Sequence, residues 1–162
     1  LVGRRPHELV FGNYSAGDLL EVRPHIEVPA AGLAALRRTE EDLAHIQDLI
    51  ERMEAETDLK VWNGLDVTFH LAIAEASKNP VFAEVIRSIR SAMSIQSAMV
   101  NEQSHGRRAE GDAEHRSIAA AIARGSAGEA EDAMRYHLDQ VVEIVTRSLT
   151  VSSPSSDRMS SG

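Results

Sequence analysis

The sequence predicts an all-α fold, arranged as an antiparallel bundle of six to seven helices. Aromatic residues make up only 4% of the 162 residues, and β-branched residues rarely gather into the alternating runs that are typical of strands. Apolar residues recur instead at helical spacing, in segments bounded by capping residues, glycines and prolines. The connections between these segments are short, which favours antiparallel neighbours within one domain.

The first expected helix begins near Ser15 and continues to about residue 38. Residues 1–14 precede it and contain a proline, glycines and basic residues, a composition typical of a linker. Pro24 and Pro29 lie inside the helix. Because each proline removes a backbone donor and crowds the preceding turn, we expect a kink or a break at one of them.

Capping residues mark the next three helix starts. Thr39 with Asp42 forms a capping box for the second helix, which is expected to end near Glu56. Asp58 can cap the third helix. Residues 79–80 are Asn-Pro, which start the fourth helix with a cap and a proline at its first position.

The last third of the chain predicts two more helices. A polar stretch over residues 101–112 interrupts the helical pattern, and the fifth helix follows it and ends at Gly125. Residues 126–129 then form a capping box for the sixth helix. The helical domain is expected to span residues 15–150, and the Ser-rich residues 151–162 are expected to be a disordered tail.

Composition narrows the class of protein. The chain has no cysteine, which excludes disulfides and thiolate chemistry and favours a cytoplasmic location. No apolar run approaches the ~18 residues of a membrane span, so no membrane association is expected. The formal charge is −8, from 17 Lys+Arg against 25 Asp+Glu, and this sign repels phosphate backbones. We therefore expect no DNA binding by this chain alone.

Four residues on three expected helices have the chemistry of one metal site. Asp66 and His70 are four residues apart, so both lie on one helix face with Cβ atoms about 6 Å apart. His115 and His137 each lie beside an apolar helical stripe that faces the bundle interior. Imidazole and carboxylate ligands suit zinc first, with nickel or manganese as alternatives. From spacing alone, the alternative that these histidines are hydrogen-bonded core residues stays open.

Three segments in chain order resemble the C-terminal effector-binding domain (FCD) of GntR-type transcription regulators of the FadR subfamily. The resemblance covers roughly residues 18–138. Its segments are LLEVRPHIEVPAAGLAALRRTEEDL, DVTFHLAIAEASKNPVF and AEHRSIAAAIARGSAGEAEDAMRYHL. Such domains are helical bundles that dimerise, bind a small effector in a central cavity and control an N-terminal winged helix-turn-helix.

The resemblance also implies roles for individual residues. Many members hold a metal through an aspartate and a histidine on one helix and histidines on two later helices, and these positions are filled here by Asp66, His70, His115 and His137. The chain therefore resembles the metal-binding branch. Arg23, in the family's EVR motif, is expected to contact the effector. Its alternative role is an ion pair with Glu27, one helical turn later.

These observations together predict a ligand-sensing and dimerisation domain of a bacterial regulator. Its effector would be a small organic acid bound at one divalent metal ion, and it would reach operator DNA only through an N-terminal domain absent from this chain. Residues 1–14 would be the linker from that domain. The rival prediction is a metal-dependent hydrolase on a helical bundle, but the sequence has neither HExxH nor paired ExxH motifs. We therefore expect no enzymatic activity.

Overall fold

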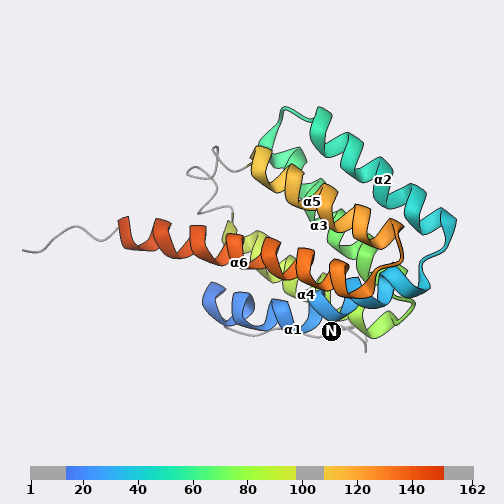
Figure 1. The fold of residues 1–162 in the computed structure, drawn as a ribbon. Coiled ribbons are helices and arrows are strands. Elements are labelled where there is room, and N and C mark those ends of the chain that lie inside the picture. The colour runs from blue at the N-terminus through green and yellow to red at the C-terminus, as the bar shows by residue number, and fades with distance from the viewer. Residues whose placement is uncertain (1–13, 98–107, 152–162) are drawn as a thin grey trace, which may run out of the picture.

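The structure is a computed structural model that describes residues 14–97 and 108–151, and this part of the chain forms six α-helices, as the sequence predicts (Figure 1). The helices are α1 (Ala16–Arg37), α2 (Glu40–Ala55), α3 (Leu59–Ala76), α4 (Pro80–Ser97), α5 (Arg108–Ala123) and α6 (Ala127–Val151). The predicted linker and tail lie outside the described residues, apart from Tyr14 and from Val151, which closes α6.

Local capping explains where the helices begin. Ser15 caps α1 and Thr39 caps α2, each in a reciprocal capping box with an aspartate three residues later. Asp58 accepts hydrogen bonds from two backbone amides of α3, and the Asn79 side chain accepts one from the first turn of α4. These predicted starts are confirmed. Gly125, which follows α5, has a φ of 70°, the left-handed conformation in which glycine ends helices.

The sequence predicts a kink or a break at Pro24 or Pro29, and no break occurs, because α1 is one continuous helix with both prolines inside it. Each proline still costs a backbone hydrogen bond. The compensation comes from packing, because α1 buries Val28 and four alanines in the molecule, at 3% exposure or less. These alanines are Ala30, Ala31, Ala34 and Ala35. Tertiary burial therefore outweighs the local penalty.

The predicted polar interruption over residues 101–112 is wrong at its end, because α5 already begins at Arg108. Residues 101–107 lie outside the described part of the chain. Contacts with Trp62 on α3 explain the early start. The Trp62 indole donates a hydrogen bond to Asp112 at 2.9 Å, and Gly111 faces the same ring closely enough that a Cβ there would touch it. This tertiary contact thus stabilises the start of α5, although the residues there are polar.

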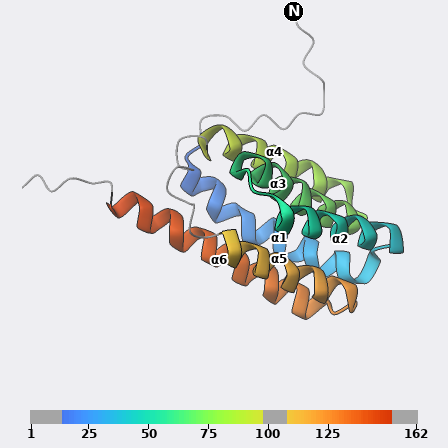
Figure 2. The same cartoon turned by 90° about the horizontal axis from the view of Figure 1, so that it is seen from above.

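Helix α1 is central to the bundle, and the site depends on this position. It packs against α3, α4, α5 and α6, while α2 packs against α3 and α5 (Figure 2). Small residues let α6 approach α1 closely, since a Cβ at Gly32 would collide with the side chain of Glu131. Within the described residues, no helix is long and apolar enough to cross a membrane.

Candidate metal centre

The four residues predicted as metal ligands come together between three helices. Asp66 and His70 are on α3, His115 is on α5 and His137 is on α6. One potential ligand atom from each of them lies within 4.8 Å of those from the other three. We call these four residues the ligand cluster.

The imidazoles of the ligand cluster are almost fully shielded from solvent. His70, His115 and His137 are 1%, 0% and 4% exposed, whereas the Asp66 side chain is 18% exposed. In the described part of the chain, the buried side-chain nitrogens without a hydrogen-bond partner include both ring nitrogens of His70 and of His115. A buried unpaired polar group costs about 1–3 kcal/mol. A neutral imidazole has one nitrogen lone pair, so each of these rings could bind a metal ion through one nitrogen, and the arrangement fits such an ion.

The carboxylate of Asp66 faces two of these imidazoles through one oxygen. Its Oδ1 lies 3.1 Å from His115 Nε2 and 3.5 Å from His70 Nε2, and neither approach is aligned as a hydrogen bond. One carboxylate oxygen and two Nε2 atoms thus converge, as the ligands of a single ion would.

Arg90 on α4 holds the other oxygen of Asp66. The guanidinium donates to Asp66 Oδ2 at 2.8 Å and to Glu27 Oε2 on α1 at 3.0 Å, and it is 5% exposed. Burial by itself would raise the pKa of Asp66, but Arg90 and the adjacent His115 outweigh it and hold that pKa well below its usual range. Asp66 is therefore a charged carboxylate at neutral pH.

Glu27 connects the ligand cluster to α1. Its Oε1 accepts a hydrogen bond from Arg23 Nε at 2.6 Å, so the predicted alternative role of Arg23, an ion pair with Glu27, is present. The pair is buried, at 3% and 2% exposure, and is not the surface pair that the spacing alone suggests. Glu27 Oε2 also lies 2.6 Å from His70 Nδ1. Burial favours the neutral acid, but Arg23 and Arg90 overcome it and hold the pKa of Glu27 well below its usual range.

Two histidines of the ligand cluster favour the neutral form of the imidazole. Burial lowers the pKa of His115, and burial together with the neighbouring His70 and His115 lowers that of His137 well below its ordinary value. A neutral imidazole has one nitrogen lone pair free, which is the form that binds metal. His137 Nδ1 also lies 2.8 Å from the carboxylate of Glu114 on α5.

Aromatic side chains pack around His115. Phe69 lies with its ring centroid 4.8 Å from that of His115, and Trp62 stacks on the imidazole at 5.9 Å. Phe69 is fully buried in the core and Trp62 packs against that core, so both are packing residues. Trp62 is also the single tryptophan of the chain, so its fluorescence reports on the ligand cluster.

The sequence reasoning missed two charged residues of the site, Arg90 and Glu114, and it named Glu27 only as a partner of Arg23 and not as a neighbour of the ligand cluster. The sequence could have indicated Arg90, because this charged residue follows Ile86 by one helical turn and so lies on the buried face of α4. Glu27 lies between the apolar residues Ile26 and Val28. A carboxylate in such a segment of a buried helix predicts a charged partner. Glu114 has no such signal, because the spacing along α5 does not reveal a partner on α6.

With this geometry established, comparison with known proteins identifies the family. The FCD domain profile matches residues 18–140, and the chain belongs to the FCD domain family. The predicted resemblance to the effector domain of GntR-type regulators is thereby confirmed. Assignment to the metal-binding branch of that family stays a proposal.

Individual relatives are transcription regulators. The HTH-type transcriptional regulator LutR of Bacillus subtilis (strain 168) is 33% identical over 136 residues, which cover 80% of this chain and 61% of that protein. A protein of Escherichia coli (strain K12) named as a regulator of an L-lactate dehydrogenase operon is 35% identical over 133 residues, 76% of this chain and 49% of its own length. The chain thus spans about half to three fifths of these relatives. Their names agree with the expectation that this domain is not an enzyme.

Solved structures share the fold. Streptococcus agalactiae GntR superposes with a TM-score of 0.67 at 26% identity, over 78% of this chain and 57% of that one. Escherichia coli McbR/YncC superposes with a TM-score of 0.73 over 84% of this chain and 70% of that one. The second protein is 21% identical, so it supports the fold alone.

The buried guanidinium of Arg90 should be far more important for stability than a surface arginine. Arg90→Met removes the guanidinium shared by the buried Glu27 and the partly exposed Asp66, and we expect it to lower the free energy of unfolding by about 3–5 kcal/mol in the presence of a chelator. Arg87→Met is the matched control, because Arg87 lies one turn earlier on α4, is 48% exposed and pairs only with surface glutamates. It should cost at most about 1 kcal/mol. Urea unfolding curves of equal midpoint would contradict this account.

Proposed function

We propose that this chain is the effector-sensing and dimerisation domain of a bacterial GntR-type transcription regulator, and that it binds a small carboxylate at one divalent metal ion. The observation that carries the proposal is the convergence of Asp66, His70, His115 and His137, in which the buried ring nitrogens of His70 and His115 have no aligned hydrogen bond among the described residues. Family membership supports the regulatory role. The domain would act in the cytoplasm.

Three imidazoles and one carboxylate define the candidate ion. Without a thiolate, this set suits zinc first, with nickel or manganese as alternatives. Four protein ligands would leave coordination positions for an oxygen donor on an ion that accepts five or six ligands. When bound, the ion would supply a fixed positive charge and a place for the effector's oxygen atoms.

The charge balance around the ligand cluster favours an anion. Asp66 and Glu27 are neutralised by the buried guanidinium groups of Arg23 and Arg90. With Glu114 ionised as well, a divalent ion would therefore leave one positive charge uncompensated among these described residues. A small carboxylate would offset this excess, and a hydroxy acid, sugar acid or dicarboxylate could also offer a second oxygen. The relative named for an L-lactate dehydrogenase operon supports this class.

Arg23 remains our candidate for contact with the effector. Its Nε is occupied by Glu27, which fixes the guanidinium plane beside the ligand cluster. A fixed planar fork can take a carboxylate in two hydrogen bonds.

Regulation would proceed by population shift between two arrangements of a dimer. Arg23 and Glu27 lie on α1, the first helix after residues 1–14, which we propose link this domain to an N-terminal DNA-binding domain. An effector that binds one arrangement better would change how the two DNA-binding domains are presented to the operator.

The arrangement counts against a metal-dependent hydrolase. Hydrolysis at a metal needs a nearby general base with a pKa close to neutral. Asp66 and Glu27 are held by arginines, and their pKa values are well below the usual range. Both are therefore weak bases.

Metal content tests the first part of the proposal. Chain purified without nickel resin and loaded with zinc should retain one ion per chain after dialysis, measured by elemental analysis. His115→Ala or His137→Ala should lose it, because each removes a ligand that the remaining three cannot replace. His45→Ala, an exposed histidine on α2, is the control and should keep it. Zinc retained equally by the wild-type chain and all three variants would exclude the ligand cluster as the zinc site.

A thermal-shift screen of organic acids tests the effector. A ligand that binds only the folded chain stabilises it by about 2.7 kcal/mol at a hundred times its Kd. We expect a small carboxylate to raise the melting temperature of the zinc-loaded chain, and the shift to vanish with EDTA. Arg23→Lys keeps a charge for Glu27 but loses the planar fork, so it should weaken the shift. A hit that survives metal removal undiminished would contradict the proposed anchor.

The oligomeric state tests the dimerisation part. Family membership leads us to expect a two-fold dimer, because such regulators recognise pseudopalindromic operators. Multi-angle light scattering at micromolar concentration should give twice the chain mass of 17.7 kDa. A monomer over the whole concentration range would show that this chain does not dimerise by itself.

A further inference from the structure

His137 differs from the other two imidazoles in how its ring is held. Its Nδ1 lies 2.8 Å from Glu114 Oε2 with the geometry of a hydrogen bond. His70 Nδ1 approaches Glu27 closely but without such alignment, and within residues 14–97 and 108–151 His115 Nδ1 has no hydrogen-bond partner. His115 is held by ring packing against Phe69 and Trp62 instead.

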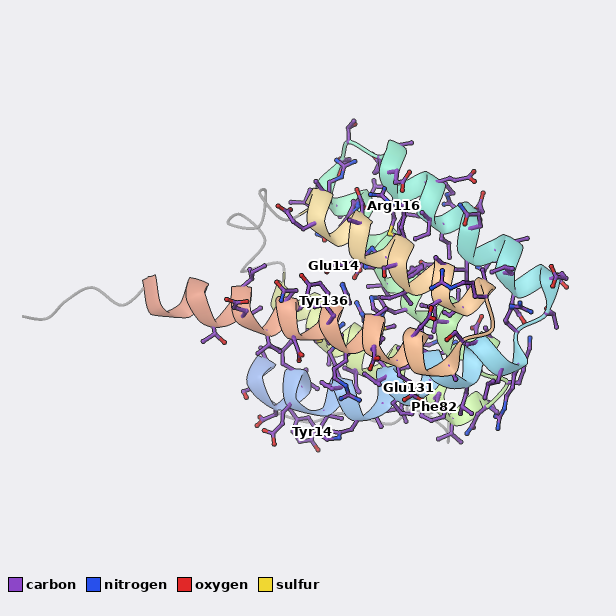
Figure 3. The ribbon with its side chains drawn as sticks, viewed as in Figure 1. Tyr14, Phe82, Glu114, Arg116, Glu131 and Tyr136 are labelled. Atoms are coloured by element: carbon purple, nitrogen blue, oxygen red, sulfur yellow. The ribbon has the colours of Figure 1, made fainter. Side chains whose placement is uncertain are left out.

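Glu114 is placed to act across the gap between two helices. Glu114 lies on α5 (Figure 3). It directly precedes His115 in the sequence, while His137 is on α6. The two side chains are only 9% and 5% exposed. A hydrogen bond with so little competing water strongly favours one ring orientation.

The contact also decides which nitrogen of His137 carries a proton. An ionised carboxylate can only accept a hydrogen bond, so with Glu114 ionised the ring donates from Nδ1. The neutral ring then has its lone pair on Nε2, the nitrogen that His70 and His115 also turn toward Asp66. A carboxylate behind a metal-binding histidine fixes the ring and makes it a stronger ligand.

We propose that Glu114 is a positioning residue of the metal centre, which holds His137 in the Nδ1–H tautomer with Nε2 directed at the ion. The role toward the ion rests on the proposed function, whereas the tautomer is a property of the metal-free chain. The role of Glu114 toward the ion and its effect on the tautomer can therefore be tested separately.

The experiment compares Glu114→Ala and Glu114→Gln with Glu110→Ala. Glu110 is exposed on α5 one turn earlier and serves as the control. Zinc affinity, measured by competition with a chromophoric chelator, should fall about 10–100-fold in Glu114→Ala. It should fall less in Glu114→Gln, whose amide oxygen can still accept from Nδ1, and stay unchanged in Glu110→Ala. Melting temperatures in EDTA identify any variant that is simply unfolded.

Nitrogen-15 NMR of the imidazoles in the metal-free chain gives the second readout. The wild-type His137 ring should show Nδ1 protonated and Nε2 unprotonated, and Glu114→Ala should lose this single tautomer. Tight zinc binding by Glu114→Ala, or a wild-type His137 protonated at Nε2, would overturn the proposal. If the wild-type chain binds no zinc but shows the Nδ1–H tautomer, the metal assignment fails while the orienting role of Glu114 stands.

Discussion

The pairing of Asp66 and Glu27 with Arg90 is the interaction on which the rest of the site depends. Two carboxylates inside a helical bundle would each be costly to bury alone, and one guanidinium donates to both, at 2.8 and 3.0 Å. The three residues come from α3, α1 and α4, so the pairing also fixes the relative placement of these helices. Because Arg90 occupies one oxygen of Asp66, the other is left to face the imidazoles.

This constraint explains why the ligand cluster is ordered although several ring nitrogens have no hydrogen bond. The helices bring Asp66 and His70 together through their four-residue spacing, and the packing of α5 and α6 adds His115 and His137. Asp66 and Glu27 are balanced by the guanidinium groups of Arg23 and Arg90. Under the proposed function the four residues would be preorganised as ligands, and the charge that a metal would add would attract an anion.

The sequence predicted those features that depend on residues close together in the chain. Caps at Ser15, Thr39 and Asp58 act within one helical turn, and the spacing of Asp66 and His70 is also local. Features that depend on distant residues were missed. The start of α5 depends on contacts with Trp62 some 50 residues earlier, and the role of Arg90 depends on carboxylates on two other helices. Family resemblance supplied the long-range grouping of the three histidines, which periodicity alone left open.

The central claim is that Asp66 and the three histidines bind one ion together, and the most direct test is X-ray absorption spectroscopy of the zinc-loaded chain. The account predicts a first shell of nitrogen and oxygen only, with the multiple-scattering pattern of three imidazoles. A spectrum with one imidazole or none would show that the ion binds elsewhere, and would contradict the account.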